Sequence, residues 1–256
     1  MHHWIKKLFA IAAPLLLTGC LWGPGKFASE LTLKKDGSFT LDYRGQIVLQ
    51  LPPDASSEAW ADSKAKCSDG DKDRPCTKAE IAEQKNAFEK KRKDSEEMAK
   101  MFGLPGLDDA SNRAFAAKLM KYAGYRSVTY RRNGVFDVDY HFVGSAKQDF
   151  LFPALPDNNL IIPFIALRRR ADGSVLVTAP AFTGGSGPMG PAAAGAGDMA
   201  KGGPMSRAEG RFTIITDGEI LTNNSEDGAT ANPVGRQLHW DVGPASNKIP
   251  ETLIRL

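Results

Sequence analysis

The sequence predicts an α+β fold, an antiparallel β-sheet with a two-helix insertion between its strands. Apolar residues between positions 27 and 51 recur mostly at every second position, as in strands with one buried face. Residues 54–123 lose this alternation and carry helix signals, and the alternation returns after residue 124. We therefore expect a single domain over residues 26–256, with its helical insertion at about 54–123.

Glycines and prolines predict where the first strands turn and end. Asp36-Gly37 and Arg44-Gly45 interrupt the alternation, so three short strands are expected, with turns at these two pairs. The double proline at residues 52–53 ends the series.

Helix signals are clearest in the middle of the chain. Thr77 is followed three residues later by Glu80, which has the form of a capping box and predicts a helix from Thr77 to about residue 102. Its apolar positions are few and residues 90–93 are all basic, so most of this helix is expected to face solvent. Asp108 or Asp109 can cap a second helix, and Gly124 is a plausible stop.

The hairpin that follows can be predicted to its register. A two-residue turn at residues 133–134 would pair Tyr130 with a polar residue and mix the two faces. A three-residue loop with Gly134 in the left-handed region pairs Tyr130 with Phe136 and Val128 with Val138. The second register keeps one face dry and is preferred.

The rest of the chain alternates between strand patterns and turns. The Gly, Ala and Pro composition of residues 184–204 predicts a flexible loop, because it cannot bury enough surface to offset its ordering entropy. The apolar tail, residues 249–256, is expected to dock on the domain. Strands are expected at residues 160–167, 174–179, 211–216, 219–222 and 237–242.

The first 19 residues have the pattern of an export signal. Two lysines precede an apolar run of about 10 residues, which is too short to span a bilayer because a spanning helix needs about 20. The residues that follow, Leu17-Thr18-Gly19-Cys20, resemble the lipobox of bacterial lipoproteins. This resemblance implies that Cys20 becomes the mature N-terminus, with diacylglycerol on its sulfur and a further acyl chain such as palmitate on its amine. Two or more chains anchor a protein stably in a membrane.

The anchor also predicts where the protein resides. Residues 20–25 are expected to form a short tether between the lipid and the domain. Leu21 is not the aspartate that resembles an inner-membrane retention signal, so in a diderm cell the periplasmic face of the outer membrane is expected.

Charge and cysteine content narrow the possible partners. The chain has a formal net charge of +3, and the signal contributes two of these charges, which argues against a nucleic-acid partner. With Cys20 lipidated, Cys67 and Cys76 remain as an even pair in an oxidising compartment, and we expect them to form a disulfide.

An acidic run between these cysteines is a candidate metal site. Asp69, Asp71, Asp73 and Glu80 fall at positions 1, 3, 5 and 12 of a loop that resembles the EF-hand pattern for Ca²⁺. Position 6, where that pattern needs glycine, is Arg74. The alternative interpretation is a solvated acidic loop beside a disulfide, and no cofactor is otherwise expected.

A second candidate lies on the predicted hairpin. Asp137, Asp139 and His141 alternate along one strand and so face the same way, as parts of a metal or hydrolytic site would. The preferred register places them on the outward face, where a wet polar surface explains them without a ligand.

Arginine clusters offer a third candidate, contact with anionic lipid headgroups. The sequence allows residues 131–132 and 90–93 to join the central cluster in one surface, and each can equally be a turn or an exposed face. The central cluster is Arg168, Arg169 and Arg170.

The order of these features is similar to LppM-type bacterial lipoproteins. The similarity rests on the signal, the lipobox, the Asp36-Gly37-Ser38 opening, the helical excursion and the closing regions at residues 216–221 and 238–240. It implies an α+β envelope domain that contacts lipids or glycolipids, without established catalytic residues.

No catalytic signature is present in the sequence, so an enzyme is not expected. The leading hypothesis is a lipid-anchored, non-catalytic binding module for a lipid, a glycolipid or an envelope protein. The alternatives are a calcium-stabilised structural lipoprotein and a hydrolase.

Overall fold

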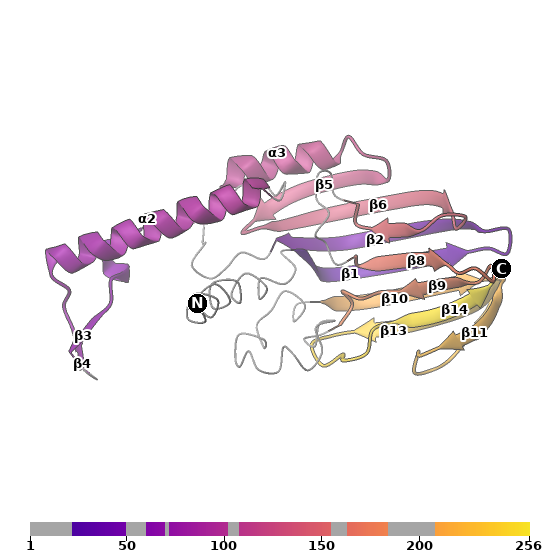
Figure 1. Ribbon diagram of the computed structural model, residues 1–256. Helices are drawn as coiled ribbons and strands as arrows, with labels where there is room; N and C mark the ends of the chain where they lie inside the picture. Colours follow the sequence, from indigo (N-terminus) through magenta and orange to yellow (C-terminus); the bar gives the residue numbers. More distant parts are fainter. Residues whose placement is uncertain (1–21, 50–59, 70–71, 102–107, 155–162, 184–207) are drawn as a thin grey trace, which may run out of the picture.

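The computed structural model describes residues 22–49, 60–69, 72–101, 108–154, 163–183 and 208–256, and its core is two β-sheets packed face to face (Figure 1). The larger sheet has seven strands in the order β12-β13-β10-β1-β2-β6-β5, and the smaller has five in the order β11-β14-β9-β8-β7. The predicted α+β class and the helical insertion between strands are confirmed.

Strand β1 lies at the centre of the seven-stranded sheet. It pairs antiparallel with β2 and parallel with β10, and the other neighbours in this sheet are antiparallel. The strands are β1 (Trp22–Leu33), β2 (Ser38–Leu49), β5 (Tyr125–Arg132), β6 (Val135–Ser145), β10 (Glu209–Thr216), β12 (Thr230–Asn232) and β13 (Gly235–Val242).

The five-stranded sheet is antiparallel throughout and covers the apolar face of the larger one. The C-terminal tail docks as predicted, and it does so as a strand, β14, between β11 and β9. The strands are β7 (Phe150–Phe152), β8 (Ile165–Arg169), β9 (Val175–Thr178), β11 (Glu219–Asn223) and β14 (Glu251–Arg255).

Aromatic side chains fill the space between the sheets. The ring of Tyr43 on the larger sheet lies 5.0 Å from that of Phe152 on the smaller. Phe182, in the turn after β9, stacks on Phe27 at 4.1 Å and contacts Phe212 edge-on at 5.4 Å. All five side chains are buried. Burial of this apolar surface is what holds the sheets together.

The insertion contains two helices and a small hairpin. Helix α3 (Asp109–Leu119) packs on β5, and Asp108 caps it by accepting from the Ser111 N–H at 2.8 Å. Helix α2 (Lys78–Met101) extends away from the sheets in Figure 1. The remaining elements are the 3₁₀ turn η3 (Asp62–Lys64) and the strands β3 (Cys67–Asp69) and β4 (Lys72–Arg74). Among the described residues, neither helix has the length and apolar character that a membrane span requires.

The predicted β5–β6 register is confirmed, since Tyr130 pairs with Phe136 and Val128 with Val138. The loop differs from the prediction. Arg132 pairs with Val135 across a two-residue turn, and a bulge between Tyr130 and Arg132 restores the register. Both turn residues have positive φ, 52° at Asn133 and 73° at Gly134, as a type I′ turn requires.

Two predictions of local structure are wrong. Residues 22–25 of the expected tether form the buried start of β1. Arg44-Gly45 is no turn, because β2 runs through it and Gly45 makes room for Phe27 on β1. The bend at Asp217-Gly218 carries the chain from β10 in the larger sheet to β11 in the smaller one. The predicted flexible loop at residues 184–204 and the strand start at residues 160–162 lie outside the described residues.

Candidate functional site

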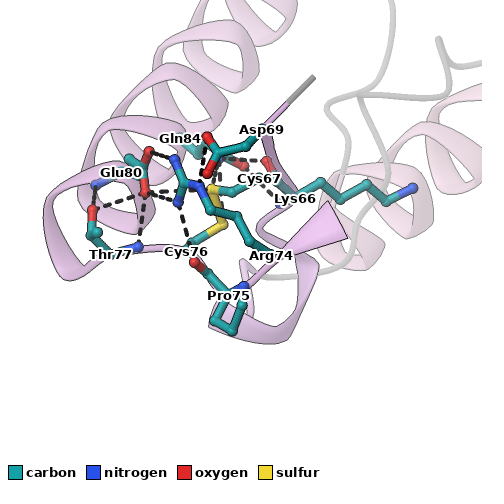
Figure 2. Close-up of polar contacts among 9 residues, drawn as sticks. All are labelled: Lys66, Cys67, Asp69, Arg74, Pro75, Cys76, Thr77, Glu80 and Gln84. Atoms are coloured by element: carbon teal, nitrogen blue, oxygen red, sulfur yellow. Dashed lines mark hydrogen bonds and ion pairs between the residues drawn. A yellow bond between two sulfur atoms is a disulfide. The ribbon is translucent and has the colours of Figure 1, made fainter. Parts of the chain in front are cut away.

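The acidic loop is folded around a disulfide and a capped helix end (Figure 2). Cys67 and Cys76 are bonded, as predicted. The predicted capping box is also confirmed: the Thr77 N–H donates to Glu80 Oε2 at 2.8 Å, and the Glu80 N–H donates to Thr77 Oγ1 at 3.3 Å. These contacts fix the start of α2 beside the β3–β4 hairpin.

Arg74 supplies the positive charge at this site. Its guanidinium donates to both carboxylate oxygens of Glu80, at 2.6 and 2.9 Å, and its Nε lies 3.2 Å from Asp69. The bidentate contact with Arg74 and the backbone hydrogen bond from Thr77 lower the pKa of Glu80 to about 2.

This pairing bears on the calcium hypothesis. Two of its four proposed ligands, Asp69 and Glu80, contact Arg74, whose guanidinium a cation would have to displace. Asp73 is exposed on β4, and Asp71 lies outside the described residues. Within the described part of the chain, no three metal-ligating side chains cluster.

The Glu80 contacts predict a pH-dependent change at the start of α2. Because the folded pKa is lowered from its ordinary 4.5 to about 2, these contacts stabilise the fold above pH 4.5 and are lost as the pH falls through 2. NMR titration of the Glu80 side chain should therefore give a midpoint near 2. In Arg74→Met the midpoint should rise toward the ordinary value. A midpoint near 4.5 in the unaltered protein would contradict the contact with Arg74.

The second candidate lies on the outward face of β6, as the register predicted. Each of its three residues contacts a charged partner on a neighbouring strand rather than a shared centre. The pairs are Asp137 with Arg131 at 2.6 Å, Asp139 with Arg44 at 3.4 Å, and His141 with Asp42 at 2.8 Å. This arrangement fits a polar sheet surface.

The arginine groups do not form one surface. Arg168 and Arg169 lie at the end of β8. Arg169 pairs with Val175 on β9, and Val175 pairs with Ile254 on β14, so these arginines lie at the end of the sandwich that holds the C-terminus. This end of the sandwich also holds the β1–β2 turn (Figure 1). Residues 131–132 lie at the opposite end, beside the start of β1. Residues 131–132 and 168–170 therefore lie at opposite ends of the sandwich and do not form the single surface that the sequence allowed.

Sequence reasoning missed a groove along the edge of β13. Strand β12 pairs only with Gly235–Gln237, so within the described residues the edge from Leu238 to Val242 has no neighbouring strand. A groove of about 320 Å³ lies beside this edge, walled by the turn after β11 and the loop before β14. Its lining includes Asp227, His239, Trp240, Ser246 and Lys248.

Asn224 braces this groove. Its side-chain oxygen accepts from the Trp240 indole N–H and the Glu251 backbone N–H, both at 2.9 Å, and its amide donates to the Ile249 carbonyl at 2.7 Å. One strand edge and two loops are thereby held in fixed positions. Such a brace preorganises a site before any ligand arrives.

Charged groups line the open side of the groove. His239 Nε2 lies 3.1 Å from the Asp227 carboxylate, most of which is exposed. The guanidinium of Arg211 holds the Asp241 carboxylate with two hydrogen bonds, at 2.6 and 2.9 Å, and lowers the pKa of Asp241. The groove thus offers hydrogen-bond donors and acceptors against a wall that contains Trp240.

Comparison with known proteins assigns no family. No family model matches the chain, and no curated protein matches it. Among solved structures, the NMR structure of the folded domain of LppM from Mycobacterium tuberculosis matches at 11% identity, over 93% of this chain and 91% of that one, with a TM-score of 0.25. Because the TM-score and the identity are low, this similarity assigns neither a family nor a function.

Proposed function

We propose that this protein is a lipid-anchored envelope protein whose β-sandwich is a non-catalytic binding module, with the β13 groove as its ligand site. The lipobox ending at Cys20 supports the anchor, and in a diderm cell the periplasmic face of the outer membrane is its location. The observation that carries the binding role is the preorganised groove, with Trp240 in its wall and Asp227 and His239 at its mouth.

The ligand that fits this groove best is hydroxyl-rich, such as the glycan part of an envelope glycolipid. Hydroxyl groups both donate and accept hydrogen bonds, so they match a lining that mixes carboxylate, imidazole, hydroxyl and ammonium groups. The space between the sheets is a poor site for an acyl chain, because stacked rings such as Phe27 and Phe182 occupy it. Recognition at the surface groove is therefore favoured over carriage of a lipid inside the sandwich.

Native mass spectrometry of the full chain, purified from its own envelope in mild detergent, tests the proposal. The expected result is diacylglycerol on Cys20 and a co-purifying glycolipid. Asp227→Asn and His239→Gln should each weaken binding of that glycolipid about tenfold, because the first replaces a carboxylate acceptor with a weaker amide and the second removes the imidazole nitrogens from the mouth of the groove. Asp137→Asn, on the outer sheet face, is the matched control and should bind normally.

The outcomes separate the two parts of the proposal. An intact mass without diacylglycerol on Cys20 would overturn the anchor. A ligand whose binding is equally strong in both groove variants would overturn the site.

A further inference from the structure

We propose that the end of the sandwich where β1 begins is a membrane-contact surface for phospholipid headgroups. The exposed residues of this surface are Arg132 and Asn133 of the β5–β6 turn, and the buried Trp22 and Leu49 lie directly beneath it. The inference rests on the lipid anchor of the proposed function, and it adds an orientation for the domain.

The short distance along the chain from the lipid to the fold carries the argument. Cys20 and Trp22 are two residues apart, so their Cα atoms are separated by at most about 7 Å. The headgroup layer of one leaflet is itself about 5–8 Å thick. The Trp22 backbone must therefore lie within the headgroups or at their outer boundary.

Trp22 is part of the rigid fold rather than of a linker. Its side chain is only 2% exposed and stacks on Phe115 at a ring distance of 5.3 Å. Its backbone pairs with Leu49 at the end of β2. Because no flexible segment lies between Trp22 and the sandwich, this end of both strands is held at the bilayer together with the anchor.

The β5–β6 turn lies at the same end of the sandwich as Trp22. The Leu49 N–H donates to the Gly134 carbonyl at 2.7 Å, which places the turn beside the start of β1. Arg132 precedes this turn and is exposed, whereas Arg131 is engaged by Asp137 at 2.6 Å. Arg132 can therefore meet an anionic headgroup, and such a charge strengthens surface binding about fivefold.

The orientation can be tested by fluorescence quenching. Fluorophores are attached at two positions, and the vesicle lipids carry a quencher on their headgroups. In separate variants of the full lipidated chain, Thr129→Cys places a fluorophore near the membrane-contact surface and Ser145→Cys places one at the far end of the outward sheet face. Thr129 pairs with Asp137, and from there Ser145 is eight residues along β6, a rise of about 27 Å. The native cysteines are bonded or lipidated, so the label reports only the introduced thiol.

In vesicles of phosphatidylcholine and phosphatidylglycerol, the label at Thr129 should be quenched several-fold more than the label at Ser145. Arg132→Glu should reduce the quenching at Thr129, and Arg170→Glu, at the opposite end, should not. Equal quenching at both positions, or stronger quenching at Ser145, would overturn the orientation in a protein whose mass already shows the lipid. A mass without the lipid would instead overturn the anchor.

Discussion

Gly210→Ala is expected to destabilise the protein by about 3 kcal/mol, because the new methyl group has no space. Gly210 on β10 pairs with Phe27 on β1 in the parallel ladder at the centre of the larger sheet. A Cβ atom at Gly210 would overlap the carbonyl oxygen of Phe27 and would lie 2.8 Å from its carbonyl carbon. These are backbone atoms, so relief requires the two strands to separate.

Chemical denaturation of the chain from residue 21 onward measures this effect. Gly243→Ala is the matched control, because beyond its two chain neighbours no heavy atom of the described residues lies within 4 Å of the Cβ position there, and its φ does not fall in the left-handed region. The control should change the free energy of unfolding by less than about 0.5 kcal/mol. A Gly210→Ala protein as stable as this control would contradict the β1–β10 pairing.

Close packing around Phe27 also explains why the turn predicted at Arg44-Gly45 is wrong. Gly45 and Gly210 flank Phe27 on the two neighbouring strands, and a Cβ atom at Gly45 would lie 2.5 Å from the Lys26 carbonyl oxygen. A glycine after a polar residue predicts a turn by local preference. Here its function is to make room for the Lys26 carbonyl and for the Cα and Cβ atoms of Phe27 on the neighbouring strand, and nothing near Gly45 in the chain reveals that strand.

Local patterns predicted most of the elements. Alternation located β1, β5, β6 and β13, and the capping box located the start of α2 at Thr77, because these signals act between residues a few positions apart. The distribution of strands between two sheets was not predictable in this way. The parallel pairing of β1 with β10 joins residues that are distant in the sequence, and alternation records only that a face is buried.

The candidate sites differ in the same way: residues on one strand can be placed from their local spacing, whereas a site built from several elements cannot. Asp137, Asp139 and His141 were correctly placed on an outward face, because their spacing along one strand decides it. The groove was missed because its lining comes from β13, the turn after β11 and the loop before β14. His239 and Trp240 are adjacent in the sequence, yet Asp227 and Asn224 reach them only through the fold.

Phe182→Ala is expected to cost about 3–5 kcal/mol, a large part of the total stability of an ordinary domain. Phe182 is 0% exposed, and it follows β9 in a turn closed by its own N–H to the Ala179 carbonyl at 3.0 Å. Its ring stacks on Phe27 at 4.1 Å with an interplanar angle of 20°. The alanine variant leaves a cavity between the two sheets that neither sheet can close alone, since the strands of each sheet are held by their own hydrogen-bond ladders.

Thermal and chemical unfolding of Phe182→Ala and of Leu151→Ala provide the comparison. Leu151 also belongs to the smaller sheet, but it is 45% exposed, so its truncation should cost less than about 1 kcal/mol. Phe182→Ala should also be non-additive with Gly210→Ala, because both act on Phe27. Additive effects, or equal stability of the two truncation variants, would mean that the sheets are not joined through the stacked pair of Phe27 and Phe182.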